Sequence, residues 1–231
     1  MASAPAHHSH PSRRTGDATE NYAKAIYALQ SRGEGAVGTS AIAERLGVSP
    51  ASASAMIKRL SEESLVEHAP YHGVRLTRRG EQVALGVIRH HRLLELFLAE
   101  ILEVPWDRVH EEAEVLEHHI SDELAERIAR KLGNPTRDPH GDPIPGPELT
   151  LEEAKTRSLG SLEEGDAGTF VRVSASDPEM LRYLSERGIA PGDRFEITER
   201  QPFDGPLTVR FGSAVETLGG GLARAMRVEL D

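Results

Sequence analysis

The chain has 231 residues, no cysteine and a formal net charge of −10. Without thiols it cannot form disulfides, thiolate metal sites or a cysteine nucleophile, and we expect any metal ligand to be a nitrogen or oxygen atom. No apolar run approaches the roughly 18 residues that span a bilayer, and the N-terminus lacks the apolar centre of a signal peptide. We therefore expect a cytoplasmic protein that makes no contact with a membrane.

The charge is distributed unevenly along the chain. Residues 1–80 hold 10 Lys and Arg against 7 Asp and Glu, whereas residues 81–231 hold 17 against 30, so the net charges are +3 and −13. A mildly basic first part on an acidic body is compatible with a protein that contacts nucleic-acid phosphates through one end.

The first 80 residues predict a disordered tail followed by a DNA-binding domain. Residues 1–16 are rich in Pro, Ser, His and Arg and are expected to be disordered. A helix follows, then the short helix TSAIAERL ended by Gly47, then a helix with Ser49 as N-cap and Pro50 at its first position. Two short helices joined by a tight turn indicate a helix-turn-helix, and SLVEHAPYHGVRLTRRG predicts the β-hairpin of a wing. Residues 17–80 are thus predicted to be a winged helix-turn-helix.

The rest of the chain predicts a helical domain and a small β domain. Residues 81–140 carry two long amphipathic helices, expected at about 78–102 and 106–132, and the Pro/Gly-rich residues 141–157 form a linker. Residues 158–231 alternate in short runs (GTFVRVS, DRFEITER, LTVRFG, RAMRVEL) around the helical segment DPEMLRYLSERG, which predicts an SH3-like β-barrel. The glycines at 219–221 are interpreted as a turn. The predicted fold class is mainly α with small β parts.

Histidines and acids recur at helical spacing in the predicted helical domain. In VHEEAEVLEHHISDE, His110, Glu114, Glu117 and His118 lie at i, i+4, i+7 and i+8, on one face of a helix. The preceding helix repeats the i, i+4 spacing with His91 and Glu95. Such nitrogen and oxygen donors suit Mn²⁺ or Fe²⁺. The alternatives are a solvated Glu-rich surface and a metallohydrolase, in which HEEAE would stand for H-E-x-x-H with Glu in place of the second His.

The predicted reading helix carries small and hydroxyl side chains. Small residues let a helix lie deep in the major groove, hydroxyls contact phosphates and base edges, and arginines of the wing neutralise phosphates. The alternative is a helix-turn-helix with a purely structural role. The candidate DNA-binding residues are Thr39, Ser49, Pro50, Ser52, Ser54, Lys58, Arg59 and Arg75.

These motifs together resemble the diphtheria toxin repressor family of metal-activated transcriptional regulators. The resemblance rests on ENYAKAIYALQ, IAERLGVSPASASAMIKRL, RHHRLLELFL, VHEEAEVLEHHISDEL and GDPIPG, and it spans residues 17–146. The C-terminal part resembles, less closely, the SH3-like (FeoA-like) domain of longer members. The resemblance implies a homodimer that binds double-stranded operator DNA when metal is bound, with two dimers on one operator as an open alternative.

The resemblance also implies two metal sites. The primary site would use Glu114, Glu117 and His118 with a residue of the first helix at Asn21, where iron sensors have Met and manganese sensors have Asp. The ancillary site would use His91, Glu95 and His110. Further candidates are Glu20, beside Asn21, and Asp177 and Glu179, because the SH3-like domain sometimes donates carboxylates; the alternative for Asp177 is a helix N-cap.

The residue at position 114 indicates the metal. The resemblance implies Cys there in iron-responsive members and Glu in manganese-responsive ones, and a carboxylate suits Mn(II) better than a softer ligand would. We therefore predict an Mn(II)-sensing repressor of metal-uptake or metal homeostasis genes. An Fe(II)-dependent repressor of iron uptake and siderophore genes is the alternative, and a winged-helix regulator of an organic ligand is another. Co(II), Ni(II) or Zn(II) are expected to substitute in vitro.

Overall fold

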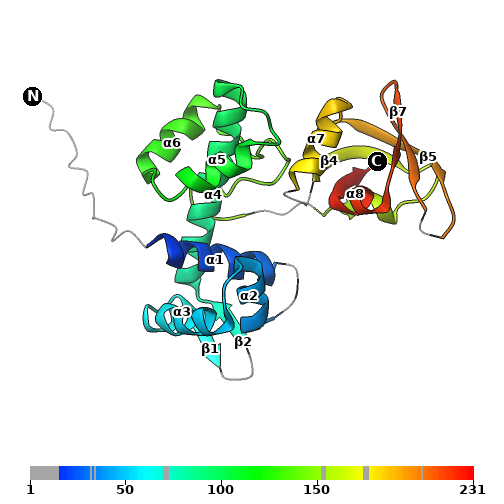
Figure 1. Ribbon diagram of the computed structural model, residues 1–231. Helices are drawn as coiled ribbons and strands as arrows, with labels where there is room; N and C mark the ends of the chain where they lie inside the picture. Colours follow the sequence, from blue (N-terminus) through cyan, green and yellow to red (C-terminus); the bar gives the residue numbers. More distant parts are fainter. Residues whose placement is uncertain are drawn as a thin grey trace, which may run out of the picture. The chain divides into compact units, whose positions relative to one another are not determined.

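The computed structural model describes residues 16–231 except 32, 34, 70–72, 152–154, 174–176 and 204. It contains two compact units, Met1–Ala84 and Leu85–Asp231 (Figure 1). The tail expected at residues 1–16 lies outside the described residues apart from Gly16. No helix in the described part of the chain is long and apolar enough to cross a membrane.

The first unit is a winged helix-turn-helix, as predicted. Gly47 takes the left-handed conformation (φ 63°) that ends the second helix, and Ser49 accepts a hydrogen bond from the Ser52 amide at the start of the third. The wing strands pair in antiparallel fashion, with Val66 opposite Leu76. The elements are α1 (Asp17–Gln30), α2 (Thr39–Leu46), α3 (Pro50–Glu62), β1 (Val66–Ala69) and β2 (Gly73–Leu76). Their core contains Ile26, Ile42, Ile57, Leu60, Leu65 and Val74.

The helical part of the second unit differs from the prediction in one respect. The first long helix, α4 (Arg78–Leu102), is present, but the single helix expected at 106–132 is wrong. Two helices stand there, α5 (Val109–Leu116) and α6 (Asp122–Lys131). The break occurs because Ser121 adopts an extended backbone (φ −88°, ψ 155°) and accepts from the Leu124 amide, which starts a new helix. Glu117 and His118 therefore lie in the turn between the two helices.

The C-terminal part of the second unit is a six-stranded antiparallel sheet in the order β3-β8-β4-β5-β6-β7. The glycines expected to form a turn instead start a helix, α8, with Gly219 as its N-cap, and neither β3 nor β7 was predicted. The core is built on Phe170, Leu184, Ile197 and Val209, and Trp106 packs against it. The elements are β3 (Arg157–Ser158), η1 (Leu159–Ser161), β4 (Ala167–Val173), α7 (Pro178–Glu186), β5 (Arg194–Arg200), β6 (Leu207–Phe211), β7 (Ala214–Leu218), α8 (Gly220–Ala225) and β8 (Met226–Leu230).

Candidate metal centre and DNA-binding surface

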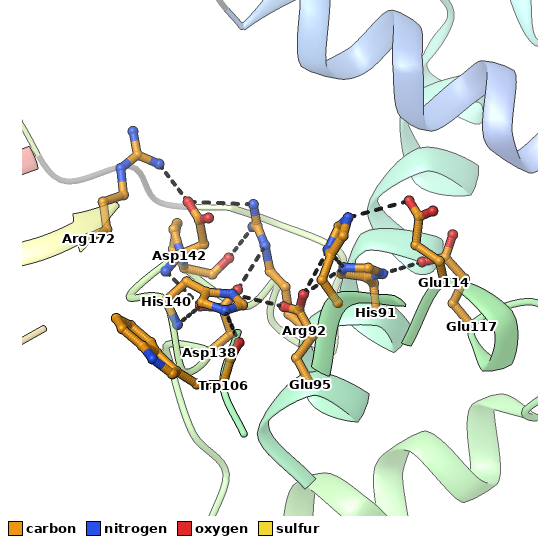
Figure 2. A network of polar contacts seen from close by, with 12 residues as sticks. His91, Arg92, Glu95, Trp106, Glu114, Glu117, Asp138, His140, Asp142 and Arg172 are labelled. Atoms are coloured by element: carbon orange, nitrogen blue, oxygen red, sulfur yellow. Dashed lines mark hydrogen bonds and ion pairs between the residues drawn. The ribbon is translucent and has the colours of Figure 1, made fainter. Parts of the chain in front are cut away.

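A buried cluster of imidazoles and carboxylates surrounds His91 of α4 (Figure 2). His91 Nε2 lies 2.9 Å from Glu95 Oε1 and 3.0 Å from His110 Nδ1, and His110 Nδ1 lies 3.0 Å from the same Glu95 oxygen. Helical spacing places His91 and Glu95 one turn apart on α4, and α5 supplies His110. The ligand atoms of these three residues are close enough to one another to hold one metal ion.

The turn between α5 and α6 extends this cluster. Glu117 is 2% exposed, and its two oxygens face different imidazoles: Oε2 lies 2.5 Å from His91 Nδ1 and Oε1 lies 3.3 Å from His118 Nε2. His110 Nε2 lies 3.7 Å from Glu114 Oε1, and the Glu114 side chain is 57% exposed. The structure thus joins the six donors predicted in the helical domain into one network. Their assignment to a primary and an ancillary site remains a prediction.

Two buried residues of the same network were not predicted as ligands, namely Asp138 and His140. Both lie in the segment that follows α6, which we call the strap (residues 137–146). Glu95, Asp138 and His140 form a second group whose ligand atoms lie within 4.8 Å of one another. Glu95 belongs to both groups: Oε1 faces His91 and His110, and Oε2 lies 3.7 Å from His140 Nδ1.

The tautomer of His140 suits metal binding. Its Nε2 lies 2.8 Å from the Trp106 carbonyl oxygen, which can only accept, so Nε2 must carry the proton. In the neutral ring Nδ1 then presents a lone pair towards Glu95. A hydrogen bond of this kind from the outer nitrogen is what usually orients a metal-ligating imidazole.

The buried charges shift the pKa values of three groups. Burial raises the pKa of Glu95, but hydrogen bonds from His110, His140 and His91 outweigh burial and hold its pKa well below the usual range. Burial, with the nearby charges of Glu95 and Asp142, raises the pKa of Asp138 to about 8. For His140 burial lowers the pKa, but the hydrogen bond to Glu95 and the charges of Glu95 and Asp138 raise it to about 9.

The network is arranged to exchange protons for a cation. His91 has a carboxylate oxygen within 2.9 Å of each of its ring nitrogens, yet a neutral imidazole carries only one N–H. Both contacts are hydrogen bonds only if a second proton is present, either on the ring or on one of the two carboxyl groups. Metal ligands must be deprotonated, and a divalent ion would replace those protons. The buried imidazoles and carboxylates fit Mn²⁺, Fe²⁺ or another borderline divalent ion.

The remaining predicted candidates are Asn21, Glu20, Asp177 and Glu179. Asn21 and Glu20 lie on α1 in the first unit, where Asn21 is exposed and Glu20 half-buried. Asp177 caps α7, where it accepts from the Glu179 amide at 2.9 Å, as the alternative interpretation predicted. Among the described residues, neither Asp177 nor Glu179 belongs to a group that could hold an ion.

The candidate DNA-binding residues lie on the exposed surface of the first unit. From α3, Ser52, Ser54 and Lys58 are solvent-exposed, and Arg75 is exposed on β2 of the wing. Ser54 Oγ donates to the Pro50 carbonyl, and Ser49 and Ser52 share a hydrogen bond of 2.9 Å. The other candidates are Arg59, which pairs with Glu63 at 3.0 Å, and Thr39, which is half-buried at the start of α2.

Three protein-family models match successive parts of the chain. Residues 14–74 match the iron dependent repressor N-terminal DNA binding domain, residues 77–146 match the iron dependent repressor metal binding and dimerisation domain, and residues 157–230 match the FeoA domain. With the winged helix and the buried donor cluster, these matches define the class, a metal-responsive DNA-binding regulator.

Relatives and solved structures match along almost the whole chain. Iron-dependent repressor IdeR of Mycobacterium tuberculosis is 33% identical, with 92% of this chain and 97% of that protein covered. Diphtheria toxin repressor of Corynebacterium glutamicum is 34% identical, with coverages of 92% and 96%. The structure of a manganese-dependent transcriptional repressor in complex with manganese is 43% identical, with a TM-score of 0.84 and coverages of 92% and 100%. The chain therefore belongs to the diphtheria toxin repressor family of metal-dependent transcriptional repressors. The matched relatives are repressors, which rules out the metallohydrolase alternative.

Proposed function

We propose that this chain is a Mn(II)-activated repressor that binds double-stranded operator DNA as a homodimer and controls metal-uptake or metal homeostasis genes. The observation that carries the choice of metal is the donor set, which consists of carboxylates and imidazoles. Glu114, which reaches towards His110 from α5, supplies a hard oxygen. Carboxylates suit Mn²⁺, whereas thiolates and thioethers favour later or softer ions. The similarity to a manganese-dependent repressor of known structure supports the same choice.

The mechanism follows from the charges in the network. Glu95, Glu117 and Asp138 are buried and come from α4, the α5–α6 turn and the strap. Each would otherwise need a proton or an arginine nearby, because an uncompensated buried carboxylate is costly. A divalent ion held by these carboxylates would supply that positive charge. Donors from three separate segments would bind the ion tightly only when those segments are assembled. Because the assembled state then has the higher affinity for the ion, metal binding would shift the equilibrium from the loosened state to the assembled one.

The homodimer is supported by exposed apolar side chains on the helices of the second unit. Ile101 and Leu102 at the end of α4, Val115 on α5 and Leu124 on α6 are 42%, 57%, 65% and 44% exposed. The family model for this segment describes a dimerisation domain. Val115→Glu should shift the protein towards the monomer in light scattering. Unchanged mass would contradict the assignment of Val115 to the interface, and mass measurements on the DNA complex would distinguish one dimer from two.

The central test is metal-dependent DNA binding. A duplex selected from random-sequence DNA in excess Mn²⁺ provides the probe, and fluorescence anisotropy measures its affinity with Mn²⁺, Fe²⁺ under anaerobic conditions, Co²⁺, Zn²⁺ or a chelator. Tight binding is expected with metal and loss of binding in chelator. The double variant Glu117→Gln with His118→Ala should lose the metal dependence. Glu123→Gln, which changes an exposed carboxylate paired with Arg127, is the control. Equal affinity in chelator would contradict the proposal.

Iron is the second candidate metal, favoured by the 33% identity to an iron-dependent repressor. Glu114→Cys should move the preference for activation from Mn²⁺ towards Fe²⁺ and Co²⁺, because sulfur is the softer donor. Unchanged selectivity would show that Glu114 does not set the metal. Asn21 remains a ligand candidate from the resemblance, and Asn21→Asp should raise Mn²⁺ affinity if it binds the ion.

A further inference from the structure

Two arginines of α4 hold the strap from the helical side. Arg89 Nη1 donates to the Pro145 carbonyl oxygen at 2.6 Å, and Arg89 also pairs with Glu126 of α6. Arg92 Nη1 donates to the Pro143 carbonyl oxygen. Proline-rich segments lack amide donors, so their carbonyls need outside partners, and these guanidinium groups provide them.

Strand β4 holds the same strap from the side of the sheet. Arg172 Nη1 donates to Asp142 Oδ1 at 2.9 Å (Figure 2). The Val173 amide donates to the His140 carbonyl oxygen at 3.1 Å. At Gly141, which has a φ of 86°, an added Cβ would lie 1.9 Å from the Val171 carbonyl oxygen. The strap thus touches the β4 backbone directly, with no room for a side chain between them.

The residues that touch β4 and the residues of the second donor group share one backbone turn. Asp138 Oδ1 accepts from the amides of both His140 and Asp142, each at 2.9 Å. Asp138 and Asp142 also pair through the backbone, since the Asp138 amide donates to the Asp142 carbonyl oxygen at 3.0 Å. A displacement of Asp142 must therefore move the Asp138 carboxylate, and with it the group that faces Glu95.

Asp142 is the residue at which the helical side and the sheet meet. Its carboxylate lies between Arg172 of β4, at 2.9 Å, and Arg92 Nη2 of α4, at 3.9 Å. Asp138 Oδ2 also lies 3.7 Å from Arg92 Nε. Without Arg172, Arg92 would be left as the arginine paired with both aspartates, and a guanidinium drawn closer to Asp138 would compete with a metal ion for its oxygen.

We propose that Arg172 is a positioning residue for the second donor group: through Asp142 it holds Asp138 and His140 in place opposite Glu95. Docking of β4 on the strap and metal binding by Glu95, Asp138 and His140 are then coupled. Because coupling between two equilibria is reciprocal, metal binding must also tighten the contact of the strap with β4. This inference rests on the proposed function, since it assumes that the second group binds an ion.

The first test measures Mn²⁺ binding by calorimetry in the full chain and in Arg172→Leu. Changes to residues that orient metal ligands typically cost roughly 10- to 100-fold in affinity, and we expect a loss of that size for one binding step only. His140→Ala identifies that step. Arg172→Lys, which keeps a cation, should restore most of the affinity. Arg194→Leu is the control, because Arg194 lies in the same sheet but forms an exposed pair with Asp231.

The second test uses amide hydrogen exchange. In the wild type, excess Mn²⁺ should slow exchange at the Val173 amide, whereas the Gly192 amide, which donates to the Phe170 carbonyl oxygen at 2.7 Å, should not change. In Arg172→Leu the effect of Mn²⁺ on Val173 should be lost. A merely structural arginine would instead change both amides with or without metal.

The outcomes separate this inference from the proposed function. If the wild type binds no Mn²⁺, the proposed function fails and this inference fails with it. If both proteins bind Mn²⁺ with the same affinities and Val173 responds equally in both, only the role of Arg172 is refuted. If Arg172→Leu does not fold, Asp142→Asn provides the test, because it weakens the same ion pair while keeping an acceptor, and unchanged affinities there would refute the proposal.

Discussion

The negative charge of Asp138 should lower the free energy of unfolding of the metal-free protein, so Asp138→Asn should raise it. The side chain is buried beside Glu95 and Asp142, and these surroundings raise its pKa to about 8 from an ordinary 3.8. The folded protein therefore binds this proton more tightly than the unfolded chain does. The stability that this group contributes is present in acid and is lost as the pH rises towards 8. An asparagine has no such proton to lose.

The size of the effect follows from the same shift. A pH of 7 lies about three units above the unfolded pKa of Asp138 and below its folded pKa, which sets an upper limit of about 4 kcal/mol on the effect. The asparagine of the variant would keep the acceptor for the amides of His140 and Asp142, but its nitrogen would face the Arg92 Nε now 3.7 Å from the carboxylate. Relaxation of the protein around the buried Asp138 carboxylate lowers the expected gain in stability further. We expect a gain of about 2 kcal/mol.

Urea unfolding followed by circular dichroism at pH 7 measures this gain in chelator. Repeated in excess Mn²⁺, the wild type should gain stability, by about 2.7 kcal/mol at a free metal concentration 100 times the Kd. The Asp138→Asn variant should gain less, since it lacks one of the three donors. Asp177→Asn is the control: Asp177 caps α7, and asparagine caps a helix about as well. An Asp138→Asn protein no more stable than the wild type in chelator would refute the reasoning.

Three further outcomes are expected. In chelator, the free energy of unfolding should decrease as the pH is raised from 6.5 to 9. The reason is that Asp138 and His140 have pKa values of about 8 and 9 in the folded protein and lower ones when unfolded. An increase in stability over this range would contradict these pKa directions. Trp106 is the single tryptophan and its carbonyl oxygen lies 2.8 Å from His140 Nε2, so Mn²⁺ should change its fluorescence, and His140→Ala but not His118→Ala should remove the change. Ser49→Ala should lower the stability of the winged helix by about 1 kcal/mol in thermal unfolding, whereas Ser49→Asp should preserve it.

Regular spacing made much of this molecule predictable. The winged helix, α4 and the pairing of His91 with Glu95 follow from local signals, namely caps, a C-terminal glycine and the helical repeat. The break between α5 and α6 did not follow, because the apolar pattern continues through it and only Ser121 marks the new start. The prediction that one helix carries His110 through His118 was wrong, although the structure still brings these side chains together.

The spacing of residues in the sequence could not predict the ligand candidates of the strap. Asp138 and His140 lie in RDPHGD, a Pro/Gly-rich stretch that has no repeat to place side chains on a face. Their approach to Glu95 depends on long-range contacts from Arg92 and from β4. The available signal was an aspartate and a histidine two residues apart, just before the segment predicted to be a linker.

A donor set of imidazoles and carboxylates also determines how the protein responds to oxidants. The chain contains no cysteine, so none of its side chains can be oxidised to a sulfenic acid, be glutathionylated or form a mixed disulfide. Sensors with thiolate ligands lose metal when those thiolates are oxidised and need a reductant to recover. Here peroxide has no thiol to attack at the metal centre, so occupancy can follow the supply of the ion even when the thiol–disulfide balance of its surroundings is disturbed.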